Sequence, residues 1–329
     1  MLNYYYQIFG WILKFFYDLV GNNYALALII FTVFFRMILL PSTISQQKGA
    51  AKQMRMQAKL AKIQEKYKDY HKPDRQQKMA EEQQALYQQE GYSSMTGGCL
   101  PLLIQLPIMY GLYGAVYKPL SYILGLSTEI VEKLGATFTE ITGEAIQLGG
   151  RVAHGEMLLL GKIEEIAAQT EGLSQEVISA LTSFDFTILG VPLYGVPSMD
   201  TLKNLGSATR DEKLLLLIPI LAALTSLMSS LLMQARQNKN NPQAAQMKSM
   251  TLMTMLMMPA MSLWITFSLP AAVGVYWIIS NIVAFFQTLI LGYTHEPRKL
   301  LAKLMVEETI ERRSREANLK GVAKLNDEN

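Results

Sequence analysis

Residues 24–42 constrain the fold of this chain more than any other stretch. They form an apolar run that contains one arginine, Arg36. A helix needs roughly 20 mostly apolar residues to cross a bilayer, so this run predicts a membrane span. A guanidinium stays charged and costs about 2.5 kcal/mol or more at the bilayer centre. Arg36 therefore either faces a water-filled cavity in a helix bundle or snorkels about 9 Å to the headgroups.

Further apolar runs of similar length occur at 98–117, 214–233, 248–268 and 273–292. With 50% hydrophobic and 17% charged residues and a mean hydropathy of +0.16, the chain is predicted to be a polytopic membrane protein. The single cysteine, Cys99, excludes an intramolecular disulfide and a zinc cluster. Common catalytic and nucleotide-binding motifs are absent from the sequence, so we expect no enzyme, cofactor or metal site. The net charge of +3 is too small to predict direct nucleic-acid binding.

Residues 1–22 favour a helix that lies in the membrane interface. Eight aromatic residues occur in this stretch, and aromatic rings prefer the headgroup zone. A sixth span is the main alternative, and Lys14 and Asp18 in the middle of the stretch argue against it. A secretory signal fits poorly, because no basic region precedes the apolar part.

Residues 44–96 are polar and favour helices. The run His-Lys-Pro-Asp at 71–74 interrupts them, because the residue before a proline resists the α conformation. We therefore predict a hairpin of two helices, over about 45–70 and 74–91. Residues 43–95 hold ten Lys or Arg and six acids, a net charge of +4. The hairpin is either simply solvated or a docking site for partners or anionic headgroups, and we favour docking.

Residues 119–211 form a long acidic segment with twelve acids and five Lys or Arg, a net charge of −7. The stretches 128–148 and 156–181 predict amphipathic helices, and two prolines then indicate an irregular return. Because basic loops tend to face the cytoplasm, the hairpin and the loop 235–247 are predicted there and the acidic segment outside. Five spans then place the N-terminus outside and the tail inside.

The expected fold is an all-α membrane protein: a five-transmembrane-helix bundle with a cytoplasmic helical hairpin and an outward interfacial helix. The predicted parts are the interfacial helix 1–22, span 23–43, hairpin 44–96, span 97–118, outward helical segment 119–212, span 213–234, loop 235–247, spans 248–269 and 270–293, and tail 294–329.

Several polar side chains are predicted inside the spans. The neutral ones, Gln105, Ser280, Asn281 and Gln287, either line a cavity or form hydrogen bonds between helices, worth about 0.6 kcal/mol each. Trp277 either closes a groove or only packs. Gly111 and Gly114 would permit close helix approach.

Methionine is dense in residues 247–261, where seven occur. Flexible thioethers suit a surface that must accept many different sequences. The alternative is that these methionines only cover a surface of the bundle that faces lipid.

Short motifs in a specific order resemble the YidC/Oxa/Alb family of membrane protein insertases. The motifs are FRMILLP at 35–41, QQK at 46–48 with IQEKY at 63–67, GCLP at 98–101 with QLP at 105–107 and LY at 112–113, and LP at 269–270 with VYW at 275–277, Asn281 and Gln287. The resemblance covers about 20–120 and 185–295. Each motif alone is weak, whereas their order together with the number of spans is specific.

The resemblance implies five core spans around a hydrophilic groove that opens to the cytoplasm and to lipid. Arg36 would receive the polar, often acidic segment of a nascent membrane protein, while the apolar segment slides into the lipid. The other groove residues would be Gln105, Trp277, Ser280, Asn281 and Gln287. The family works in the bacterial plasma membrane, alone or beside the Sec translocon, and its mobile hairpin supports substrate or ribosome engagement. No ATP, metal or covalent chemistry is implied.

Two departures from the family pattern are expected. The chain starts directly at the interfacial helix, without a signal sequence or an extra first span. Residues 128–182 read as an added helical insert, to which the resemblance assigns no role. A small-solute transporter or channel is the alternative function, and a passive scaffold is a third, although we find no inverted repeat of the kind transporters tend to show.

Overall fold

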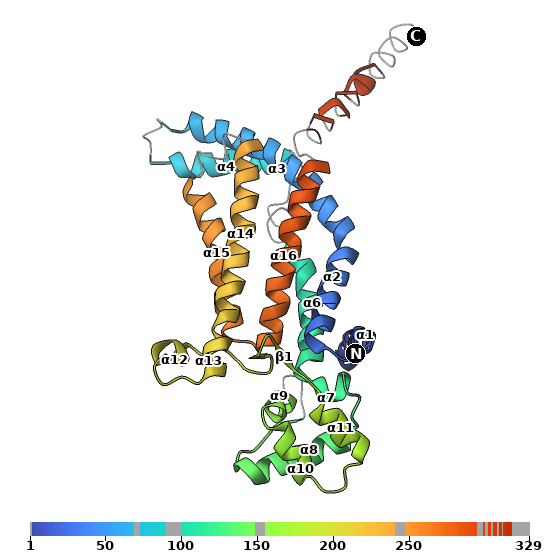
Figure 1. The fold of residues 1–329 in the computed structure, drawn as a ribbon. Coiled ribbons are helices and arrows are strands. Elements are labelled where there is room, and N and C mark those ends of the chain that lie inside the picture. The colour runs from blue at the N-terminus through green and yellow to red at the C-terminus, as the bar shows by residue number, and fades with distance from the viewer. Residues whose placement is uncertain are drawn as a thin grey trace. The chain divides into compact units, whose positions relative to one another are not determined.

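The computed structural model describes residues 2–68, 73–89, 100–148, 155–240 and 248–294, together with 299, 302–303, 305–307, 309–310 and 312–317 of the tail (Figure 1). The chain divides into two compact units. The first unit comprises Met1–Leu39, Leu102–Leu232 and Leu252–Phe285, and the second comprises Leu40–Pro101, Met233–Thr251 and Phe286–Asn329. Each unit is described separately below.

Most of the described residues are helical, as expected for an all-α protein. The elements are α1 (Leu2–Leu19), α2 (Tyr24–Ile38), α3 (Leu40–Lys66), α4 (Arg75–Gln89), α6 (Leu100–Tyr117), α7 (Pro119–Tyr122), α8 (Thr128–Thr142), α9 (Gly155–Leu160), α10 (Ile163–Gln169), α11 (Gln175–Thr182), β1 (Thr187–Ile188), β2 (Val191–Pro192), α12 (Met199–Lys203), α13 (Arg210–Leu215), α14 (Leu217–Asn240), α15 (Lys248–Thr266) and α16 (Ala271–Thr294). The small antiparallel β1–β2 pair, with Ile188 opposite Val191, was not predicted.

Two stretches of the described chain are helical, long and apolar enough to cross a membrane. They are Arg210–Arg236, with a mean hydropathy of 2.2, and Ala271–Thr294, with a mean hydropathy of 1.7. Shorter apolar helices cover Tyr24–Ile38 and Met255–Thr266. The remainder of the five-span prediction is therefore not decided by helix length and composition alone.

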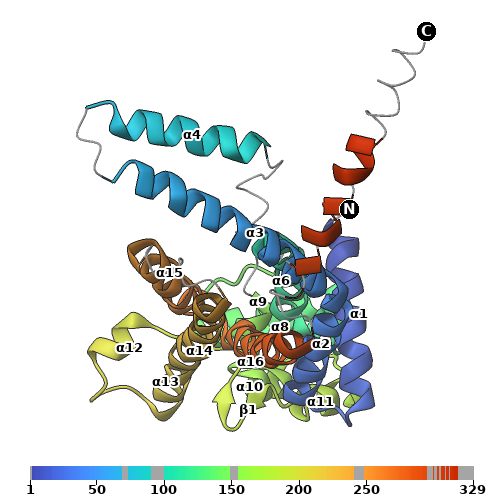
Figure 2. The ribbon, with the colours of Figure 1, turned by 90° about the horizontal axis from the view of Figure 1, so that it is seen from above.

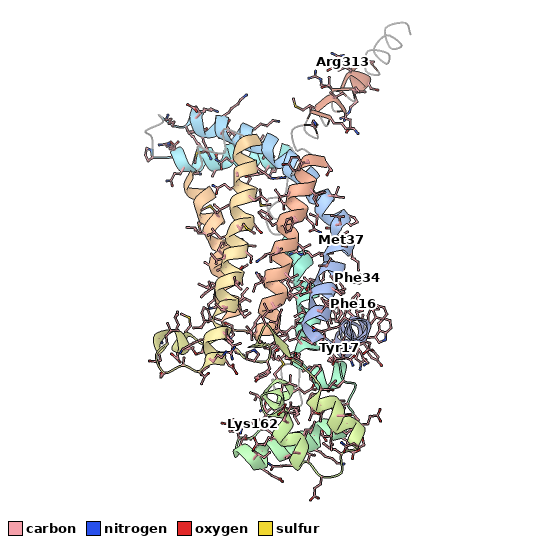
Figure 3. The ribbon with its side chains drawn as sticks, viewed as in Figure 1. Phe16, Tyr17, Phe34, Met37, Lys162 and Arg313 are labelled. Carbon is pink, nitrogen blue, oxygen red and sulfur yellow. The ribbon has the colours of Figure 1, made fainter. Side chains whose placement is uncertain are left out.

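In the first unit, α1 runs crosswise to α2 (Figures 1 and 2). The inner face of α1 buries Phe9, Leu13 and Phe16, which recur at helical spacing. Phe9 stacks on Phe35 of α2 with ring centroids 5.1 Å apart. Phe16 meets Phe34 edge-on at 5.4 Å (Figure 3). Aromatic contacts therefore fix the angle between the two helices.

α1 also packs on α6 through the two glycines singled out in the sequence. A Cβ at Gly111 would lie 2.5 Å from the Phe9 ring, and a Cβ at Gly114 would overlap the Tyr6 ring. The Tyr5 hydroxyl donates to the Pro107 carbonyl of α6 at 2.6 Å. The prediction that both glycines permit close packing is confirmed, and the partner of both is α1.

The acidic segment folds into short helices rather than two long ones. The predicted helix over 128–148 ends at Thr142, where Gly143 adopts a left-handed conformation with φ 73°. The predicted helix over 156–181 is wrong, because it consists of α9, α10 and α11. Gly161 forms the first break, and Gly172 (φ 78°) precedes Ser174, whose side chain caps α11. Left-handed glycines and new N-caps end helices that apolar periodicity alone would extend.

This segment also caps the start of α16. The first N–H groups of a helix have no partner within the helix. Here the Ala271 N–H donates to the Gly195 carbonyl at 2.8 Å, and the Ala272 N–H donates to the Leu193 carbonyl at 3.0 Å. The return that follows the β1–β2 pair therefore sets where α16 begins.

A buried carboxylate ties the insert to α7. Glu156, on α9, is 2% exposed. Its Oε2 accepts from the Ser121 N–H at 3.0 Å, and its Oε1 accepts from the Ser121 hydroxyl at 2.5 Å. Burial raises the pKa of Glu156 above its usual value of 4.5, and the two hydrogen bonds from Ser121 only partly oppose that shift.

The second unit contains the helical hairpin. α3 ends at Lys66 and α4 begins at Arg75, so the break includes the predicted proline-containing turn at 71–74. Residues 69–72 lie outside the described residues. α3 and the residue that follows it bury one stripe of side chains, formed by Met56, Leu60, Ile63 and Tyr67. The Lys66 ammonium meets the Glu82 carboxylate at 2.8 Å, an exposed ion pair that adds little stability.

In the same unit, Arg236 near the end of α14 binds α16. Its Nη1 donates to the Thr288 carbonyl at 2.5 Å and its Nη2 donates to the Leu289 carbonyl at 3.1 Å. Its guanidinium carbon lies 5.9 Å from the centroid of the Tyr293 ring. A Cβ at Gly292 would overlap the guanidinium, so glycine at this position makes room for the arginine.

We expect Gly111→Ala and Gly114→Ala each to destabilise the protein by about 1–3 kcal/mol, because the added methyl group overpacks the contact with α1. Thermal unfolding of the purified full chain measures this. Gly206→Ala is the matched control, since a Cβ there meets no atom within 4 Å. Melting temperatures equal to that of the control would contradict the packing role.

For Glu156, stability should fall as pH rises. A folded-state pKa above the unfolded value means that the folded state holds the proton more tightly. The contribution is fully present below about 4.5 and is lost as pH rises through the raised pKa. Glu156→Gln, which stays neutral, should therefore be more stable than the unmodified chain at pH 8, by about 1 kcal/mol.

This advantage should shrink as the pH is lowered toward 5, as measured by melting temperature at each pH. The exposed Glu176 of the same insert provides the control, since Glu176→Gln removes a carboxylate that is already hydrated and should not reproduce the stabilisation at pH 8. If the melting temperatures of Glu156→Gln and the unmodified chain differed by the same amount at every pH, the buried charge could not be the cause of the difference.

Candidate functional site

Three of the residues singled out in the sequence lie within about one turn of α16. Trp277 is 8% exposed, Ser280 is 3% exposed, and Asn281 is half-buried. At about 100° per residue, the three side chains spread over an arc of roughly 100°. This spacing lets one short stretch of α16 reach three different neighbours, and all the contacts below lie in the first unit.

The first neighbour is α2, which presents Arg36. Arg36 occupies the last turn of α2, where a positive charge is favoured by the helix dipole. Its Nε donates to the Ser280 hydroxyl oxygen at 2.7 Å, and its Nη2 donates to the same oxygen. The arginine side chain is therefore directed at α16. A hydroxyl acceptor orients a guanidinium without neutralising its charge.

The second neighbour is α15. The Trp277 indole N–H donates to the Ser262 hydroxyl at 3.0 Å, and both residues are buried. One turn further along α15, the Thr266 hydroxyl donates to the Ser262 carbonyl at 2.7 Å. The indole is thus held against α15 by a directional bond as well as by packing.

The third neighbour is α14. The Asn281 side-chain amide donates to the Thr225 hydroxyl at 3.3 Å and reaches the Ala222 carbonyl at 3.5 Å. In return, the Ser229 hydroxyl donates to the Asn281 backbone carbonyl at 3.3 Å. Asn281 therefore makes bonds between helices, which was one of its two predicted roles.

Two predicted site residues are not brought to this cluster by the described structure. Gln287 is buried but belongs to the second unit, six residues after Asn281 on α16. Gln105 lies in α6, and its side chain is outside the described residues. Their assignment to a common site stays a prediction.

Sequence reasoning missed Ser262 and Thr225. Each is a small hydroxyl residue inside an apolar run, where such residues are common and carry little information. The useful signal would have been Trp277 on the next span, because an indole N–H buried in an apolar bundle needs an acceptor. Which hydroxyl supplies that acceptor depends on how α15 packs against α16.

The cluster combines one fixed positive charge with neutral donors and acceptors. Its chemistry suits the binding of a polar or acidic group and supplies no activated nucleophile. Among the residues that the structure describes, no group of three or more His, Cys, Asp or Glu side chains is placed to hold a metal ion.

The sequence matches a family model described as 60Kd inner membrane protein over residues 15–298. Similarity to individual proteins extends over nearly the whole chain. The chain is 28% identical to "Membrane protein insertase YidC 2" of Listeria innocua serovar 6a over 319 residues, which is 96% of this chain and 80% of that protein. It is 27% identical to "Membrane protein insertase YidC 1" of Listeria monocytogenes serotype 4b over 322 residues, with the same coverage of 96% and 80%.

A third relative is similar over a shorter region. "Membrane protein insertase MisCA" of Bacillus subtilis (strain 168) is 36% identical over 100 residues, which is 30% of this chain and 38% of that protein. The identity of this shorter alignment is higher than the 28% of the longer alignment with the Listeria innocua protein.

The bond between Trp277 and Ser262 is expected to stabilise the bundle by about 0.5–1.5 kcal/mol. A double-mutant cycle of Trp277→Phe and Ser262→Ala measures this coupling, with unfolding of the full chain in detergent as the readout. Each single variant should lower stability, and the double variant should be less destabilised than the sum. Strict additivity would show that the indole contributes by packing alone.

Proposed function

Because the chain belongs to the 60Kd inner membrane protein family, the YidC/Oxa1 family of membrane protein insertases, we propose that it inserts nascent membrane proteins into the bilayer through a hydrophilic groove that bears Arg36. The observation that carries this proposal is the direction of the Arg36 side chain. Its guanidinium bonds Ser280, a buried residue of another helix. Snorkelling to the headgroups would instead carry the side chain along its own helix toward the membrane surface.

The groove would lower the cost of moving a substrate's polar flank into the membrane. A carboxylate about 4 Å from Arg36, at an effective dielectric near 20, gains on the order of 4 kcal/mol before desolvation. That energy is enough to capture an acidic segment and too small to trap it. The neutral lining of the groove is proposed to form further hydrogen bonds with the polar flank as it moves. Its residues are Ser280, Asn281, Trp277, Gln105 and Gln287.

We propose five spans, built on α2, α6, α14, α15 and α16. α1 would lie in the outer interface, since its outer face exposes apolar side chains: Tyr4, Ile8, Trp11, Phe15 and Leu19. The basic hairpin α3–α4 and the tail would be cytoplasmic, and the acidic segment extracytoplasmic, as the distribution of Lys and Arg favours. The location in the bacterial cytoplasmic membrane follows from the family.

Substrate helices would leave along α15. Its described surface exposes flexible methionines at 253, 257 and 258 and an indole at Trp264. Thioether side chains adapt to partners of different shape. The hairpin is proposed to engage substrate or the ribosome, and the protein to act alone or beside a Sec translocon.

Replacing the arginine tests the groove. Arg36→Ala should reduce insertion of a reporter with an acidic outer tail about tenfold, equivalent to about 1.4 kcal/mol, because the charge that receives the tail is lost. Arg36→Lys should retain part of the activity. Insertion into proteoliposomes, followed by protease protection of the tail, is the measurement.

A reporter with a neutral tail should be affected much less, and Arg210→Ala, at an exposed arginine of α13, serves as the matched control. Unchanged insertion of the acidic reporter by Arg36→Ala would refute the groove. Solute uptake by the same vesicles would instead support a transporter.

A further inference from the structure

The return from the acidic insert to α13 exposes four apolar side chains at three-residue spacing. Val196 is 47% exposed, Met199 is 53%, Leu202 is 46% and Leu205 is 46%. We call these four residues the 196–205 patch. The sequence indicated only an irregular return here. The patch instead includes a short helix, α12, whose start is capped by the Ser198 hydroxyl, which accepts from the Asp200 N–H at 3.1 Å.

The charged residues of α12 form an ion pair at the surface. The Lys203 ammonium and the Asp200 carboxylate are 3.0 Å apart, with side chains 71% and 81% exposed. At about 100° per residue, Asp200 lies roughly 160° around the helix from Leu202. One side of α12 is therefore polar and hydrated, while Met199 and Leu202 share the other side. A long lysine side chain at the edge of such a surface can keep its ammonium in water.

We propose that the 196–205 patch is a second membrane anchor, which inserts into the boundary between headgroups and acyl chains of the outer leaflet. That the patch contacts lipid follows from the segment that comes directly after it in the chain. It precedes the helical stretch Arg210–Arg236, which is long and apolar enough to cross a membrane. Six residues separate Lys203 from Arg210, and a chain of that length reaches at most about 24 Å. The patch thus stays near the level at which this helix enters the bilayer.

The start of the helix is also held in place. Thr209 and Glu212 form a reciprocal capping box at the beginning of α13, with Thr209 N–H to Glu212 Oε2 at 2.7 Å. Further along, α14 exposes apolar side chains from Leu217 onward, including Ile220, Leu221 and Leu224. The exposed charged residues at 210–213 therefore lie between the apolar patch and the apolar surface of α14.

The position of α12 complements that of α1. Both views place α12 outside the bundle, beside α13 and α14 and on the side away from α1 and α2 (Figures 1 and 2). In Figure 1 both lie toward the end of the bundle at which α16 begins. Two interfacial elements on opposite sides resist tilt better than one, so the pair would hold the bundle at a defined depth. The spanning of α14, the interfacial position of α1 and the naming of the outer leaflet rest on the topology in the proposed function.

Depth-dependent quenching tests the anchor in the full chain. Cys99 is replaced by serine, and a single cysteine carrying an environment-sensitive NBD label is placed at Leu202. The protein is reconstituted in phosphatidylethanolamine–phosphatidylglycerol vesicles with or without a lipid bearing a doxyl group near its headgroup. We expect blue-shifted emission and strong quenching by the doxyl lipid. Asp200→Cys is the matched control, and its label should be quenched mainly by aqueous iodide.

Three results would overturn the proposal. Emission at Leu202 that is neither blue-shifted nor quenched by doxyl lipid, or iodide quenching of both labels, would mean that the patch lies in water. Blue-shifted emission at Leu202 that doxyl lipid does not quench would mean that protein, such as a second copy, covers the patch. A label at Met199→Cys should give the same result as the label at Leu202, which excludes an effect of labelling that is confined to one position. No substrate is present, so failure here is independent of failure of the insertion assay.

Discussion

The need to satisfy polar groups inside an apolar bundle governs this structure. In hydrocarbon, a donor or acceptor without a partner costs several kcal/mol, so each polar side chain dictates what must lie beside it. α16 concentrates this constraint in residues 277–281, from which Trp277 bonds α15, Ser280 accepts from Arg36 on α2, and Asn281 bonds α14. One helix therefore sets the positions of three others, and the arginine is aimed by the same contacts.

The acidic segment 119–212 has a structural consequence for this arrangement. Carbonyls of Leu193 and Gly195, in the return that follows the β1–β2 pair, satisfy the first N–H groups of α16, so this return defines where the central helix starts. Aromatic residues of the acidic segment also reach α2, where the rings of Tyr24 and Phe186 lie 4.2 Å apart. The acidic segment is thus connected to both α2 and α16, two of the helices that carry the candidate site. At the same end, α1 and the 196–205 patch present apolar side chains outward.

Sequence reasoning succeeded where a local rule decides the outcome. The proline-containing turn separates α3 from α4, and Gly111 and Gly114 admit the rings of Phe9 and Tyr6. It failed over 156–181, where apolar periodicity predicted one helix: the chain breaks at Gly161, and again where the left-handed Gly172 precedes the N-cap Ser174. Ser262 and Thr225 were missed because a hydroxyl in an apolar run is informative only once its neighbour is known.

The sequence alone determined the class of the protein, the helical nature of its apolar runs and the family to which it belongs, because composition, periodicity and motif order are properties of the chain itself. It left Arg36 with two possible directions and Asn281 with two possible roles. Tertiary structure decided that Arg36 points at Ser280 and that Asn281 bonds α14. These residues are separated by tens to hundreds of positions, so their pairing depends on how helices pack, which no local pattern encodes.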